Sequence, residues 1–237
     1  YDDLNTTSNQ LVYCGINNLF GEITWFYPTS TSNVVNRAVT YSYLDSTAKR
    51  PIWFTNANSL FPRSAWEDSA VFGLPHATQY NASVDTSFDV TGNTDGTTIY
   101  YEHETGVNQQ ASGTTAVAIP ANITSGDYDI TQKVVRGAAT NMADLRGDGE
   151  NIMRISRIIP DFISQQNNIV AQLDVRDYPN DAAASSPLGP FTLTPTTKKV
   201  DTRARGRAIA LTISNTAVDT SWKLGTFRLD IHAGGRR

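Results

Sequence analysis

The sequence KKVDTRARGRAIALTISNTAVDTSWKLGTFRLDIHAGGRR, residues 198–237, carries the pattern that decides the fold. From Arg203 to Ile213, every second position is an arginine or a branched apolar residue: Arg203, Arg205, Arg207, Ile209, Leu211 and Ile213. Alternate side chains of an extended strand share one face, so we expect one strand over 200–213 with these six on one side. A second strand is expected over 222–231. Two strands are not stable alone in water, so we expect them to be the last strands of a larger sheet.

The same short-strand pattern recurs throughout the 237 residues, whose composition is rich in Thr, Ser, Asn and aromatic side chains. Segments of aromatic and β-branched residues alternate with Asn, Gly, Ser and Pro. In the first half these segments are 11–14, 22–27, 38–44, 51–54, 77–80, 98–102 and 114–119. In the second half they are 123–130, 152–159, 169–178, 191–193, 200–213 and 222–231. A short helix is expected only at 140–145. We therefore predict an all-β protein.

The charge of the chain is unevenly distributed. Residues 1–123 contain four basic and eleven acidic side chains, a net charge of −7, whereas residues 124–237 contain fifteen basic and twelve acidic, a net of +3. This difference predicts two modules, which we place at 1–122 and 123–237. No apolar segment is long enough to cross a bilayer as a helix. Because the chain begins at Tyr1, we expect a processed product or a piece of a longer protein.

The two modules differ in strand pattern. In 1–122, short strands occur in groups of four within about forty to fifty residues, as in propeller blades, although two blades are too few to close a propeller. In 123–237, the segment 169–178 alternates cleanly between apolar and polar residues, which favours an antiparallel β-sandwich. The expected fold is an incomplete set of propeller-like blades followed by an antiparallel β-sandwich.

Residues for catalysis or metal binding are sparse. His76, His103 and His232 fall in separate segments, and Cys14 is the only cysteine, so we expect a free thiol and no zinc site. The acidic loops at 89–95 and 144–150 lack the spacing of a calcium loop and are interpreted as solvated. Glu102 and Glu104 are expected on one face of a strand, and we interpret that face as solvent-exposed rather than catalytic. We predict no enzyme activity and no cofactor.

The arginine row of Arg203, Arg205 and Arg207, preceded by Lys198 and Lys199, has three possible partners. It can pair with acids of the same subunit, lie at a subunit interface, or line a passage for DNA, where phosphate contact needs no base sequence. The expected location is a subunit interface or a lumen, with the interface preferred. On that preference, Arg205→Glu blocks assembly, whereas normal assembly with altered DNA retention indicates the lumen.

Several segments resemble one family, the tail nozzle or tail-tube-extension proteins of short-tailed bacteriophages. The most specific are FGEITWFYP (20–28), SRIIPDF (156–162) and the closing RGR (205–207), WKLG (222–225), RLDI (228–231) and GRR (235–237). The similarity extends from about Leu11 to Arg237, and the chain resembles the C-terminal part of such a protein.

This resemblance implies a structural subunit of the virion tail without enzyme activity. It implies a homo-oligomeric, hexameric ring that contacts adaptor or portal proteins and tail fibres and passes phage DNA non-specifically through its lumen. The alternative from the residues is a receptor- or glycan-binding tail module, similar to a tailspike, which requires an exposed aromatic platform and, for cleavage, converging carboxylates. A secreted β lectin is a third option.

Overall fold

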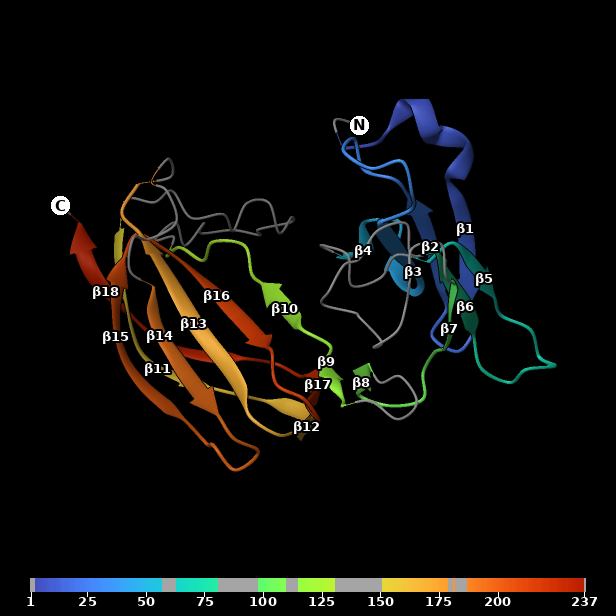
Figure 1. Ribbon diagram of the computed structural model, residues 1–237. Coiled ribbons are helices and arrows are strands. Elements are labelled where there is room, and N and C mark those ends of the chain that lie inside the picture. The colour runs from blue at the N-terminus through green and yellow to red at the C-terminus, as the bar shows by residue number, and fades with distance from the viewer. Residues whose placement is uncertain are drawn as a thin grey trace. The chain divides into compact units, whose positions relative to one another are not determined.

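The computed structural model describes residues 3–56, 63–80, 98–109, 115–130, 151–178, 181 and 187–236 (Figure 1). The chain forms two compact units, Tyr1–Gly106 (unit 1) and Val107–Arg237 (unit 2). The second unit thus begins at Val107 rather than at the expected 123. Because residues 107–123 contain no Asp, Glu, Lys or Arg, the net charges of −7 and +3 also describe units 1 and 2.

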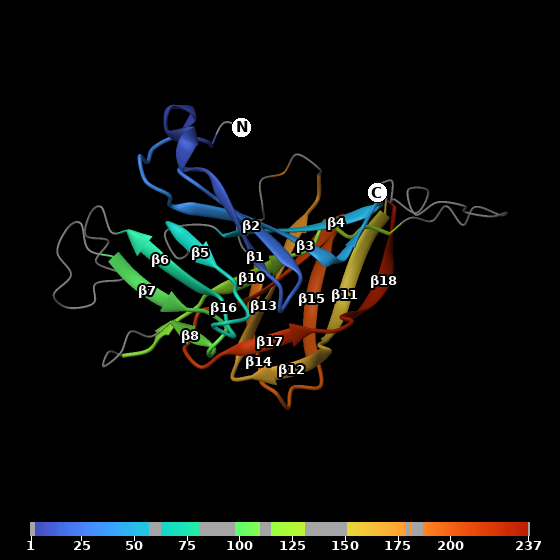
Figure 2. The ribbon, with the colours of Figure 1, turned by 90° about the vertical axis from the view of Figure 1, so that its right-hand side faces the viewer.

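Unit 1 contains a four-stranded and a three-stranded antiparallel sheet (Figure 2). A short 3-10 helix, Thr6–Leu11, precedes them, and the Asn5 side chain caps it by accepting hydrogen bonds from the backbone of Thr7 and Ser8. The first sheet is a meander of β1 (Tyr13–Asn17), β2 (Glu22–Tyr27), β3 (Arg37–Thr47) and β4 (Arg50–Asn56). The second consists of β5 (Ala65–Glu67), β6 (His76–Tyr80) and β7 (Thr98–Glu102).

Trp66 of β5 joins these two sheets. Its ring lies 5.8 Å from that of the fully buried Phe26, and its indole nitrogen donates to the carbonyl of Ile16 at 2.8 Å. Gly15 makes this approach possible, since a Cβ there would lie 2.5 Å from the Trp66 ring. The face of the first sheet turned toward Trp66 carries the small or polar residues Gly15, Thr24, Ala38, Thr40 and Ser42 and the stacked rings of Tyr13 and Phe26.

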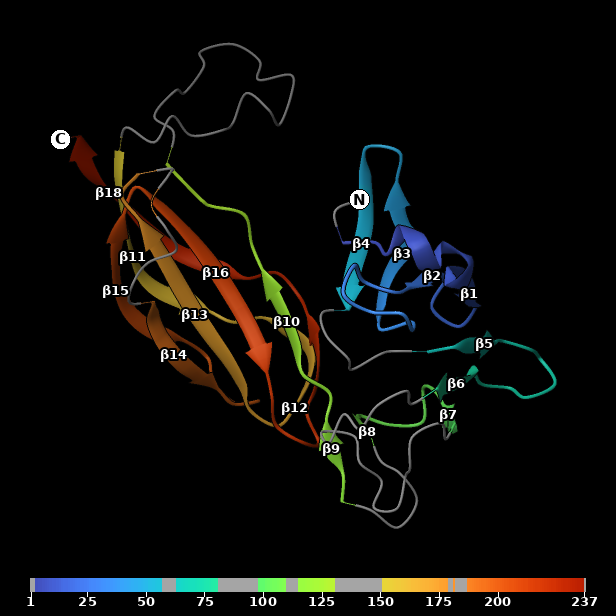
Figure 3. The same cartoon turned by 45° about the horizontal axis from the view of Figure 1, so that its top comes forward.

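The described residues of unit 2 form four antiparallel sheets. The largest has the order β10-β16-β13-β14, and the next β15-β11-β18, while β12-β17 and β8-β9 are two-stranded. Figure 3 shows β16, β13 and β14 on one side and β11 and β15 behind them. The strands are β8 (Asn108–Gln109), β9 (Val117–Ala118), β10 (Ala121–Thr124), β11 (Asn151–Ile159), β12 (Phe162–Gln166), β13 (Ile169–Arg176), β14 (Leu188–Leu193), β15 (Val200–Gly206), β16 (Ala208–Asn215), β17 (Ser221–Leu224) and β18 (Arg228–Arg236).

One apolar cluster lies between the two larger sheets of unit 2. Met153, Ile155 and Ile158 enter it from β11, and Ile169, Ala171 and Leu173 from β13. The remaining buried members are Leu193, Ala204, Ile209, Leu211 and Ile213. These side chains occupy alternate positions of their strands, as expected where one sheet face is buried, except in β11, where a bulge between Ile155 and Arg157 shifts the pattern so that Ile158 is buried. The described part of the chain is nearly all β, and none of its antiparallel sheets closes on itself.

The expected single strand over 200–213 is wrong in one respect. The chain breaks at Arg207, so that β15 and β16 belong to different sheets. Gly206 lies against β13, where an added Cβ would be 2.3 Å from Cγ1 of Val175, and the Arg207 amide donates to the Arg176 carbonyl at 2.9 Å. The arginines of β15 and the apolar residues of β16 therefore do not share the face of one strand.

The expected strand over 222–231 is also divided, at Gly225, into β17 and β18. The Gly225 amide donates to the Asp161 carbonyl at 2.8 Å, and an added Cβ would lie 2.8 Å from the same oxygen. β12 was not expected. The strands predicted at 22–27, 38–44, 51–54, 98–102, 152–159 and 169–178 are confirmed with small shifts of their ends. The expected helix at 140–145 and the acidic loops at 89–95 and 144–150 lie outside the described residues.

Candidate functional site: the outer face of the sheet β15-β11-β18

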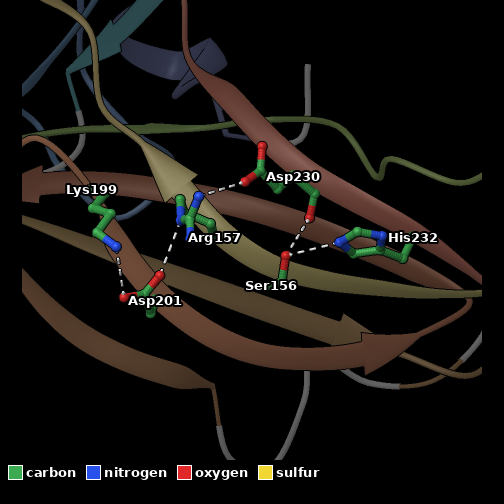
Figure 4. A network of polar contacts seen from close by, with 6 residues as sticks. All are labelled: Ser156, Arg157, Lys199, Asp201, Asp230 and His232. Atoms are coloured by element: carbon green, nitrogen blue, oxygen red, sulfur yellow. Dashed lines mark hydrogen bonds and ion pairs between the residues drawn. The ribbon is translucent and has the colours of Figure 1, made fainter.

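An ion-pair network crosses all three strands of this sheet at one end (Figure 4). Arg157 of β11 donates from Nε to Asp201 of β15 at 3.0 Å and from a terminal nitrogen to Asp230 of β18 at 3.3 Å. The Lys199 ammonium lies 3.5 Å from the same Asp201 carboxylate. The hydrogen bond from Arg157 lowers the pKa of the Asp201 carboxyl below its ordinary value. Two cations and two carboxylates thus balance each other here.

Further along the same face, the described residues include arginines that are not paired with carboxylates. Arg154 of β11 lies directly opposite Arg205 of β15 on one side and His232 of β18 on the other. Arg154, Arg203 and Arg205 are exposed. Within the described part of the chain, no carboxylate lies at ion-pair distance from any of these three. We call this surface, made of Arg154, Arg203 and Arg205 with Ser156 and His232, the arginine face.

A cavity of about 780 Å³ lies on the arginine face. All five of its residues line the cavity, together with the small residues Ala233 and Gly234. The Ser156 hydroxyl and the Nε2 atom of His232 are 3.1 Å apart within it, as Figure 4 shows. Three guanidinium groups converging on one hollow, without an internal counter-charge in the described residues, can bind an anion by charge-assisted hydrogen bonds.

A second cavity, of about 310 Å³, shares Arg205 with the first. Its other lining residues are Ile152, Asp177, Tyr178 and Arg207. Arg207 is half-buried at the break between β15 and β16. Arg205 therefore connects two cationic hollows.

Sequence reasoning located part of this site. Of the predicted residues, Arg203 and Arg205 lie on the arginine face, and Arg207 lines the second cavity. Lys198 is exposed in the segment before β15, and Lys199 belongs to the ion-pair network. Pairing of Arg203 and Arg205 with acids of their own subunit is not found among the described residues. Arg154, Ser156 and His232 were missed, because only strand register brings them beside β15.

A buried polar cluster lies in unit 1 around Arg63, which is 3% exposed. Its Nε donates to Nε2 of His103 at 3.1 Å, a terminal nitrogen donates to Gln79 at 3.1 Å, and its guanidinium lies 3.7 Å from the Tyr101 ring centre. Burial and the neighbouring guanidinium lower the pKa of His103 to about 3. Burial lowers the pKa of Arg63 to about 10, so Arg63 is charged and His103 neutral at pH 7. A single charged arginine whose nitrogens donate to neutral acceptors can be packed in the interior of unit 1.

The acids expected on one strand face are arranged differently. β7 ends at Glu102, and Glu104 lies beyond it with a positive φ of 62°. Glu104 accepts a hydrogen bond from Asn17 at 3.1 Å, and burial raises its pKa. Burial, with the charges of Glu104 and Asp45, also raises the pKa of Glu22. In the described residues, no three His, Cys, Asp or Glu side chains group in a way that could hold a metal ion.

The outward face of the first sheet of unit 1 is apolar. Strand register places two rows of residues there: Ile16, Ile23, Tyr41 and Trp53 in one, and Cys14, Trp25, Val39 and Thr55 in the other. Trp53 is 53% exposed and Ile16 46%, and the Trp53 ring contacts those of Tyr41 and Trp25 at 4.8 and 5.8 Å. The opposite face carries the buried Thr24, Thr40 and Ser42. We call Ile16, Ile23, Trp25, Val39, Tyr41 and Trp53 the apolar face.

No model of a known protein family and no curated protein matches this chain. The described part of the chain contains no helix with the length and apolarity needed to cross a membrane.

Proposed function

We propose that this protein is a structural subunit without catalytic activity that assembles with copies of itself into a ring in a bacteriophage tail, where the ring retains and conducts DNA. Two lines of support are independent of each other. One is the resemblance of segments such as residues 20–28 and 156–162 to the tail nozzle family. The other is the apolar face of unit 1. On this proposal, β1–β4 form one propeller blade, and the two larger sheets of unit 2 form a β-sandwich.

The apolar face is the observation that carries the proposal. In the first sheet of unit 1, polar Thr24, Thr40 and Ser42 are buried, while Trp53 and Ile16 are about half exposed. Soluble monomers rarely leave such a contiguous apolar surface in water, and large exposed patches mark sites of association. Tryptophan and tyrosine are enriched at the centres of protein interfaces. A closed ring buries the same patch on every copy.

The test is the mass of the protein in solution, measured by light scattering, with particles viewed by electron microscopy. The unaltered chain is expected to form rings, and the double variant Ile16→Ser/Trp53→Ser to remain monomeric with an unchanged β-sheet circular dichroism spectrum. The control is Val71→Ser, which removes an apolar side chain that is 87% exposed outside the sheets and should assemble normally. A monomeric unaltered protein at high concentration, or rings formed by the double variant, would contradict the proposal.

One observation favours a second candidate, a glycan-binding tail module. The rings of Trp25, Tyr41 and Trp53 cluster on an accessible sheet face, and aromatic rings of this kind can stack on sugars. A glycan-array screen separates the two functions. Binding to a defined saccharide that is lost in Trp53→Ser supports this candidate. A ring-shaped assembly that binds no saccharide supports the first function.

A further inference from the structure

Two arginines of β11 stand on the same outer sheet face in opposite electrostatic surroundings. Arg157 faces a carboxylate on each neighbouring strand, Asp201 and Asp230. Arg154 faces Arg205 and His232 at the equivalent cross-strand positions. Like charges directly opposite each other destabilise an antiparallel pair. Within the described residues, this part of the face therefore concentrates positive charge without a carboxylate at ion-pair distance.

We propose that the arginine face binds the phosphate groups of a nucleic-acid backbone. The inference rests on the proposed function in one respect, because a conduit for DNA brings a phosphodiester chain to this surface. The guanidinium group forms paired hydrogen bonds with phosphate oxygens, and it remains charged at any physiological pH. Arg154, Arg203 and Arg205 provide three such groups around one cavity of about 780 Å³.

The composition of the cavity favours phosphate over a protein partner. The centres of protein interfaces are enriched in Trp, Tyr, Phe, Met and Arg and depleted in Ser and Ala. The arginine face shares only the arginines with such a centre, because the other described residues that line its cavity are Ser156, His232, Ala233 and Gly234. The apolar face of unit 1 has the composition of a protein interface. We therefore assign self-association to the apolar face and phosphate binding to the arginine face.

The spacing of the cations fits a linear polyanion. Arg203 and Arg205 lie two residues apart on β15, a separation of about 7 Å along the strand. Arg205 also lines the second cavity, which Arg207 and Asp177 line as well. A chain with regularly repeated charges can follow this row, whereas a single small anion occupies one hollow only. Among the described residues that line the larger cavity, the only aromatic ring is the His232 imidazole, which contacts the Ser156 hydroxyl, so we expect contact with phosphates rather than bases and hence no sequence preference.

The experiment measures binding of fluorescein-labelled duplex DNA by anisotropy over a series of salt concentrations. The unaltered protein is expected to bind two unrelated sequences equally. The logarithm of its association constant for DNA should fall against the logarithm of the salt concentration with a slope of about −3, as for three neutralised phosphates. The triple variant Arg154→Gln/Arg203→Gln/Arg205→Gln should bind at least about tenfold more weakly at low salt and lose most of this slope. The control Lys49→Gln/Arg50→Gln/Lys223→Gln removes the same charge from exposed positions outside the sheet β15-β11-β18 and should bind normally.

Each outcome bears on the proposal. Absence of DNA binding, or equal binding by the triple variant and the unaltered protein, would overturn it. Displacement of DNA by millimolar inorganic phosphate would overturn it in favour of a small-anion site. Loss of ring assembly in the triple variant with DNA binding retained would show that the face meets another protein chain. A monomeric protein whose DNA binding depends on the three arginines would support this inference while contradicting the proposed assembly.

Discussion

Gly15 shows how one residue without a side chain sets the packing of unit 1. The Trp66 ring occupies the space that a Cβ would fill, at 2.5 Å from its ideal position. We predict that Gly15→Ala destabilises unit 1 by about 1–3 kcal/mol, the usual effect of overpacking a filled interior. Chemical denaturation followed by tryptophan fluorescence measures the change. Gly106→Ala, which places its Cβ in open space, is the control and should have little effect.

His103 makes the stability of unit 1 depend on pH. Its pKa in the folded protein is about 3, below the value of about 6.5 for an unfolded chain. As pH falls below about 6.5, the unfolded state binds a proton that the folded state does not, so stability is lost down to the folded pKa near 3. The loss is up to about 1.4 kcal/mol for each pH unit.

We therefore predict that His103→Gln, which retains an acceptor for Arg63 but does not titrate, flattens the stability profile between about pH 6.5 and 5. Denaturant midpoints measured across this range provide the test. His232→Gln, on the exposed arginine face of unit 2, serves as the matched control. An equal slope in the unaltered protein and in His103→Gln would exclude His103 as the cause.

At the level of the elements, the sheet β15-β11-β18 combines a balanced and an unbalanced set of charges. We predict opposite effects of two substitutions on β11. Arg157→Gln should lower the thermal midpoint of unit 2 at low salt because Asp201 and Asp230 lose their shared partner. Arg154→Gln should raise it slightly because the repulsion with Arg205 is removed. Both effects should disappear in molar salt, where charges are screened within about 3 Å. Shifts of the same sign in both variants would contradict this assignment.

Residue patterns predicted most of the strands but not where two of them break. The segments 22–27 and 169–178 were found because aromatic and β-branched residues alternate with polar ones there. The breaks at Arg207 and Gly225 carried no such signal, because each depends on a backbone contact made in the folded unit, with Arg176 and Asp161 respectively. Three of the five residues of the arginine face, Arg154, Ser156 and His232, were missed because only strand register brings them beside β15.

In the molecule as a whole, the two units have separate interiors, and we predict separate unfolding transitions. Leu173 is fully buried in the apolar cluster of unit 2. Leu173→Ala should lower the stability of unit 2 by about 2–5 kcal/mol and leave the transition of unit 1 unchanged. Differential scanning calorimetry measures both transitions, and Gly15→Ala should shift only that of unit 1. One joint transition that moves with either substitution would show that the units unfold together.

The residue order by itself determined the strand content, the division into an acidic and a basic part, and the unusual arginine row, because strand periodicity and charge are properties of neighbouring positions. Only the tertiary structure decided that β15 and β16 belong to different sheets, that Arg154 stands opposite Arg205, and that the apolar face of unit 1 points outward. The physical reason is register. A strand has two faces, and the pairing with strands distant in sequence selects which face is buried and which charges meet.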